Sequence, residues 1–71
     1  MKTYREMSDQ EMLAWGAEES KARGVDLAVC SAEGLDQAQS NAKARRKAIG
    51  ATRGQATDMV IRANREARRA A

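Results

Sequence analysis

Residues 36–71 read DQAQSNAKARRKAIGATRGQATDMVIRANREARRAA, and this stretch decides the fold class that we predict. It is rich in Ala and Arg, and the whole chain contains no Pro, a composition that favours helix over strand. Gly50 and Gly54, with Thr52 between them, predict a break between two helices. One weakened helix that continues through both glycines is the alternative.

The two helices of this stretch are predicted from their caps and apolar positions. Asp36 can cap a helix that ends at Ile49, and the second helix then begins at Thr57 or Asp58 and runs to near Ala71. The small side chains at helical spacing are almost all alanines. We therefore expect an Ala-rich core, in which helices approach closely but each side chain buries little area.

Charge divides the chain into an acidic half, residues 1–36, and a basic half, residues 37–71. The first half carries four basic and eight acidic residues, a net charge of −4, and the second carries nine basic and two acidic residues, a net charge of +7. Together they give the formal net charge of +3. This asymmetry predicts either a basic surface for an acidic partner or attraction between the two halves.

In the acidic half, Ser8-Asp9-Gln10-Glu11 fits the S-x-x-E capping box that begins a helix. We expect this helix to run from about residue 9 to Arg23, with Gly24 immediately after its end. Trp15 lies in this helix and is the single Trp of the chain. We expect it to centre the core, and an exposed contact for a partner is the alternative.

Residues 25–30, VDLAVC, fit two structures. Their apolar residues alternate as in a strand, but such a strand has no pairing partner unless two copies of the chain pair. A short helix from Asp26 to about Glu33 is the alternative, and we favour it. Cys30 then serves as a small buried apolar residue.

The chain has 71 residues, which allow one domain. We predict a single all-α domain over residues 1–71, with three or four helices, an Ala-rich core and a basic C-terminal helix pair. A chain of this size buries only about 60% of its unfolded surface, so its stability is marginal. Either a partner or second copy contributes stability, as in a homodimer, or the chain is a marginal monomer.

The residues for most enzyme and metal sites are missing. The chain has no His and a single Cys, so neither a zinc site nor a Cys–His nucleophile can be assembled. Glu18 and Glu19 are adjacent and diverge by about 100° on a helix, so we expect a solvated face rather than a catalytic pair. We therefore predict a non-enzymatic protein with no metal and no cofactor.

The sequence also bears on location. No apolar run approaches the roughly 18 residues of a membrane span, and the first residues lead into no hydrophobic signal core. The single Cys excludes an intrachain disulfide, as is typical of a reducing compartment. We expect a cytoplasmic protein with no membrane partner.

The function that we predict rests on the basic half. Arg and Lys side chains can neutralise nucleic-acid phosphates and release counterions. Residues 49–71 can form a helix-turn-helix whose second helix presents Asn64, Arg65 and Arg68 to a major groove. We predict a small regulatory protein that binds nucleic acid, DNA in preference to RNA. The predicted contacts are Lys43, Arg45, Arg46, Lys47, Arg53, Arg62, Asn64, Arg65, Arg68 and Arg69.

A protein-directed function is the alternative. The basic half can bind an acidic protein surface, and a small chain without catalytic groups suits an inhibitor or adaptor that acts on a host protein complex, as many phage and mobile-element proteins do. Met7, Met12 and Trp15 would form the contact, because Met side chains adapt readily to different partners.

Overall fold

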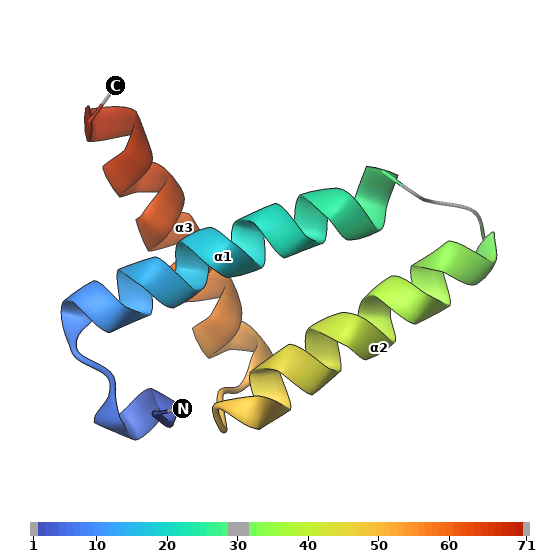
Figure 1. The fold of residues 1–71 in the computed structure, drawn as a ribbon, viewed down its shortest axis with the longest axis horizontal. Helices are drawn as coiled ribbons and strands as arrows, with labels where there is room; N and C mark the ends of the chain where they lie inside the picture. The colour runs from blue at the N-terminus through green and yellow to red at the C-terminus, as the bar shows by residue number, and fades with distance from the viewer. Residues whose placement is uncertain (1, 29–31, 71) are drawn as a thin grey trace.

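The computed structural model describes residues 2–28 and 32–70, and all the regular structure in these ranges is helical. A short 3-10 turn, η1 (Tyr4–Glu6), precedes three α-helices: α1 (Asp9–Ala28), α2 (Ala32–Ala48) and α3 (Arg53–Ala70) (Figure 1). The prediction of a small all-α domain is confirmed. The strand interpretation is wrong for residues 25–28, which are helical. The favoured short helix that begins at Asp26 is wrong as well, because Asp26 lies inside α1; Val29 and Cys30 lie outside the described residues.

The first helix begins at the predicted capping box. The amide of Glu11 donates to Ser8 Oγ over 3.2 Å, and the amide of Ser8 donates to Glu11 Oε1 over 3.1 Å. Lys2 Nζ adds an ion pair to the same carboxylate oxygen at 3.1 Å. The backbone hydrogen bond from Ser8, followed by the contact with Lys2, lowers the pKa of Glu11. The box therefore prefers the ionised form of this side chain.

The end of α1 differs from the prediction, because the helix continues through Gly24 to Ala28. A glycine inside a helix costs only about 1 kcal/mol relative to Ala. The following turn is fixed by contacts with α2: the Asp26 carboxylate accepts from Arg45 Nη2 at 3.2 Å and from Asn41 Nδ2 at 3.4 Å. These tertiary contacts offset the local preference for a helix end at Gly24.

The second helix begins earlier than predicted, at Ala32, so Asp36 lies inside it and does not cap it. Its end is formed by Gly50, which has a φ of +67°. The Gly50 amide donates to the Lys47 carbonyl oxygen at 3.1 Å, and the Ala51 amide donates to the Arg46 carbonyl oxygen at 3.0 Å. This pair of bonds is the Schellman motif, which favours glycine at this position. The predicted break is confirmed at Gly50.

The third helix also begins earlier than predicted, at Arg53 rather than at Thr57 or Asp58. Thr52 and Gln55 form a second capping box: the Gln55 amide donates to Thr52 Oγ1 at 3.1 Å, and the Thr52 amide donates to Gln55 Oε1 at 2.9 Å. The T-x-x-Q pattern is a recognised variant of the box. It places Gly54 in the first turn of α3 instead of in the break.

The core lies where α3 crosses α1 (Figure 1). Gly16 permits this crossing, because a Cβ there would overlap the backbone carbonyl of Met59 and lie 3.1 Å from the Cβ of Ala63. Trp15 is only half-buried, so the expectation that it centres the core is wrong. The buried apolar side chains are Ile49, Ala56, Met59, Val60 and Ala63.

Candidate nucleic-acid interface

The C-terminal part of α3 presents four arginines to solvent. The buried residues of this helix end at Ala63, and Figure 1 shows the following turns running past α1. A helix end that has left the core has its side chains free for another molecule. We call its exposed arginines the α3 arginine cluster: Arg62, Arg65, Arg68 and Arg69.

Few acidic groups offset this cluster. Arg69 Nη1 lies 3.6 Å from Glu66 Oε1, but both side chains are more than half exposed, and such a pair contributes little. Arg68 Nε donates to the backbone carbonyl of Asn64 at 3.4 Å. In the described part of the chain, Arg62 and Arg65 have no acidic partner. Three of the four charges are therefore not paired with an acid.

Asn64 was predicted to contact a base, but its side chain contacts α1 in the structure. Its amide oxygen accepts a hydrogen bond from the Ser20 hydroxyl of α1 at 3.2 Å. The side chain is exposed but held against α1. Its amide nitrogen is the group that remains for an incoming ligand.

The predicted contacts on α2 separate into two groups. Lys43 and Lys47 are exposed, whereas Arg45 is half-buried and turned toward α1. Arg45 forms a charge-assisted hydrogen bond with Glu19, and its Nη2 also lies 3.2 Å from Asp26 Oδ2. These contacts, the bond to Glu19 first, raise the pKa of Arg45. Since its donors are used inside the protein, we do not include Arg45 in the interface.

Glu19, the partner of Arg45, lies in a different environment from the one that we predicted. The carboxylate is buried, with a residue exposure of 2%, and also accepts from Arg23 Nε at 3.1 Å. The expectation of a solvated Glu18–Glu19 face is therefore wrong for Glu19, although Glu18 is exposed. The sequence contained a signal for this burial: Glu19 follows Trp15 by four residues, so the two side chains share one face of the helix.

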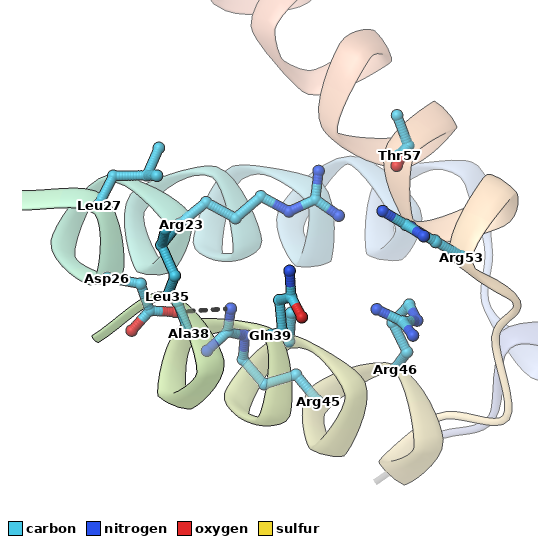
Figure 2. A pocket seen from close by; sticks show the side chains of 11 residues that line it. Arg23, Asp26, Leu27, Leu35, Ala38, Gln39, Arg45, Arg46, Arg53 and Thr57 are labelled. Atoms are coloured by element: carbon cyan, nitrogen blue, oxygen red, sulfur yellow. Dashed lines mark hydrogen bonds and ion pairs between the residues drawn. The ribbon is translucent and has the colours of Figure 1, made fainter. Parts of the chain in front are cut away.

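The remaining predicted arginines, Arg46 and Arg53, line a groove between all three helices. This groove, which we call the basic groove, has a volume of about 450 Å³. Figure 2 shows the guanidinium groups of Arg46 and Arg53 directed into it from α2 and α3, with that of Arg23 entering from α1. The structure thus assembles cations from three separate elements, which sequence spacing alone does not reveal.

A second groove is lined by residues of the N-terminal segment, α1 and α2. It has a volume of about 650 Å³ and includes Met7 and Trp15 beside alanines of α1 and α2. Met12, the third residue of the predicted protein contact, is half-buried and does not line it. The two sites therefore separate chemically into a basic groove and a largely apolar one.

Comparison with protein families, with curated proteins and with solved structures finds no match to this chain. Within residues 2–28 and 32–70, no three His, Cys, Asp or Glu side chains gather in a way that could hold a metal ion. No helix in these ranges has the length and apolar character to cross a membrane. The site has to be interpreted from its own geometry and charge.

Proposed function

We propose that this protein is a non-enzymatic regulator that binds the phosphate backbone of nucleic acid, DNA in preference to RNA, through the α3 arginine cluster. One observation carries this proposal: Arg62 and Arg65 are exposed on a helix that extends past the core and have no acidic partner among the described residues. Lys43 and Lys47 are also exposed, but they lie on α2, which Figure 1 shows on the opposite side of α1 from the C-terminal turns of α3, so we do not include them in this contact.

The physical basis is counterion release. Each phosphate neutralised by Arg or Lys frees condensed cations, which gives affinity that falls steeply with salt and does not depend on sequence. A helix with its side chains is about 10–12 Å across, close to the width of about 12 Å of the major groove of B-DNA. The free end of α3 has a shape suited to that groove.

The test is the double variant Arg62→Gln/Arg65→Gln, measured by fluorescence anisotropy with a labelled DNA duplex over a series of salt concentrations. Loss of two phosphate contacts should weaken binding and reduce the slope of log K against log salt by about 1.8. The matched control is Arg5→Gln/Lys21→Gln, which removes the same charge from exposed positions on η1 and α1. Equal slopes for the two double variants would reject the α3 arginine cluster as the contact.

The largely apolar groove supports a second candidate function, an inhibitor or adaptor that binds a host protein. Met7 and half-buried Trp15 line this groove, where a partner side chain could cover them. The test is affinity capture from host lysate with and without nuclease. A nuclease-resistant, stoichiometric partner that is lost with Trp15→Ala would support this function, whereas capture that disappears with nuclease would favour nucleic acid.

A further inference from the structure

The basic groove differs from the α3 arginine cluster because it is concave. It is bounded by α1 and α2 along its sides and by the first turns of α3 at one end, where Arg53 and Thr57 lie (Figure 2). Its volume of about 450 Å³ falls in the range of small-molecule sites. A groove of this size accepts a small ligand rather than a second folded surface.

The positive charge in this groove exceeds the negative charge around it. Four arginines line it, one of which is Arg45, and the acids beside them are Asp26 in the lining and Glu19 behind it. Arg45 pairs with both acids, and Arg23 pairs with Glu19. Arg46 and Arg53 meet no acidic side chain in the described part of the chain. Two guanidinium groups that face one space with no counter-charge favour an anion between them.

The type of anion follows from guanidinium geometry. Arginine presents a planar fork of donors that matches a phosphate or carboxylate bidentately. The Gln39 amide and the Thr57 hydroxyl also face the groove and add neutral hydrogen-bonding groups (Figure 2). Two forks with further donors suit a group with several acceptor oxygens, and a phosphate monoester has three terminal oxygens.

The other end of the groove carries two aliphatic side chains beside the Arg45–Asp26 ion pair (Figure 2). Leu27 and Leu35 line this end and remain 62% and 47% exposed, and Ala38 and Ala42 also line the groove. Large exposed aliphatic side chains beside a ligand-sized groove indicate that the ligand has an apolar part. The groove thus has two arginines without an acidic partner among the described residues at one end, and aliphatic side chains beside an ion pair at the other.

We propose that the basic groove binds a phosphate monoester whose attached group has an apolar face, as the base of a nucleoside 5′-monophosphate has. The phosphate lies between Arg46 and Arg53, and the attached group lies toward Leu27 and Leu35. This site is separate from the α3 arginine cluster and does not depend on it. Its ligand is either a free nucleotide or the 5′-phosphorylated end of a nucleic-acid strand.

The test is calorimetric titration of the whole chain with thymidine 5′-monophosphate, inorganic phosphate and thymidine. We expect saturable one-to-one binding of the nucleotide, weaker binding of inorganic phosphate and none of thymidine. Arg46→Gln and Arg53→Gln should each weaken nucleotide binding about tenfold, because each removes a charge-assisted contact. Lys47→Gln is the matched control, since it removes one charge from an exposed position adjacent to Arg46 and should leave binding unchanged.

Two further measurements separate the alternatives. Leu35→Ser should weaken nucleotide binding but not phosphate binding, and circular dichroism should show that each variant retains its helices. Arg62→Gln/Arg65→Gln should bind the nucleotide normally, so failure of the nucleic-acid proposal and failure of this one are distinguishable. Non-saturable nucleotide binding, or equal affinity of wild type, Arg46→Gln and Arg53→Gln, would overturn the proposal.

The source of the ligand is resolved by oligothymidine with and without a 5′-phosphate. If the phosphorylated strand competes with the mononucleotide and the unphosphorylated strand does not, the site takes a chain end. If the mononucleotide binds and neither strand competes, the site takes free nucleotides. Competition by both strands equally would mean that the backbone is recognised, and this would contradict a monoester site.

Discussion

The helix α1 contacts its two neighbours in different ways. Against α3 it packs closely, with Gly16 on the Met59 backbone and with buried Met59 and Ala63 beside it. Against α2 it is linked by charge, through Arg45, which bridges Glu19 and Asp26. Small residues let two backbones close up and exclude solvent, whereas long charged side chains hold helices apart. The open basic groove lies on the charged side for this reason.

The apolar contact between α1 and α3 should be more sensitive to substitution than the charged contact between α1 and α2. Gly16→Ala puts a Cβ into the Met59 carbonyl, and backbone atoms cannot move away as a flexible side chain can. We expect a loss of about 3 kcal/mol or more in the free energy of unfolding, measured by urea denaturation. Failure to fold, seen by circular dichroism, would be the extreme form of the same result.

Gly24→Ala is the control, because a Cβ at this helical position would meet no atom within 4 Å. It should raise the free energy of unfolding by about 0.5–1 kcal/mol, the ordinary gain of Ala over Gly in a helix. Similar effects of the two substitutions would show that α1 and α3 do not pack closely at Gly16.

A substitution in the charged contact between α1 and α2 should lower the free energy of unfolding by a smaller amount. Arg45→Met removes the link from α2 to both acids of α1, but Glu19 keeps its bond from Arg23 at 3.1 Å. A buried charge left entirely unpaired costs about 3–5 kcal/mol, so with one partner retained we expect a loss of about 2 kcal/mol. Urea denaturation measures this, and Lys47→Met, on the exposed face of α2, should stay within about 0.5 kcal/mol. Equal stability of the two variants would mean that the ion pairs do not hold α2 to α1.

Local signals predicted the parts of this fold that local interactions determine. The Ser8–Glu11 box and the break at Gly50 involve atoms a few residues apart, and both are confirmed. The predicted helix end at Gly24 is wrong. The helix continues to Ala28, and this longer form depends on the contact of Asp26 with α2, which is distant in sequence. The T-x-x-Q spacing of Thr52 and Gln55 is that of a capping box, but Gly54 between them led us to predict a turn.

The candidate site was less accessible to sequence reasoning. Composition marked the second half of the chain as rich in cations, but it could not separate Arg45 from Arg46, its neighbour in the chain. Both line the basic groove, but Arg45 is paired with Glu19 and Asp26, whereas Arg46 has no acidic partner among the described residues, and adjacent side chains differ by a rotation of about 100° around α2. The convergence of Arg23, Arg46 and Arg53 likewise depends on how three helices are arranged (Figure 2).

The capping boxes of α1 and α3 extend the comparison to a smaller effect, because the α1 box contains a titrating carboxylate and the α3 box does not. Glu11 has a lowered pKa in the folded chain, chiefly through the Ser8 backbone bond, so its contribution to stability is present at neutral pH. That contribution is lost as the pH falls from the ordinary Glu value of 4.5 through the lower folded value. Gln55 makes the equivalent bonds at the start of α3 without titrating.

We therefore expect Glu11→Gln to reduce the fall in Tm between neutral and acidic pH, with a small change in Tm at neutral pH. Glu6, whose pKa is lowered mainly by its hydrogen bond with the Thr3 side chain, retains its own share of the acid sensitivity in that variant. The reverse change, Gln55→Glu, should add acid sensitivity, because it installs a titrating carboxylate in the second box. Thermal melts over a pH series measure both variants. If Glu11→Gln and wild type lost Tm in parallel, the acid sensitivity would come from groups outside the α1 box, and the carboxylate there would not be a stabilising cap.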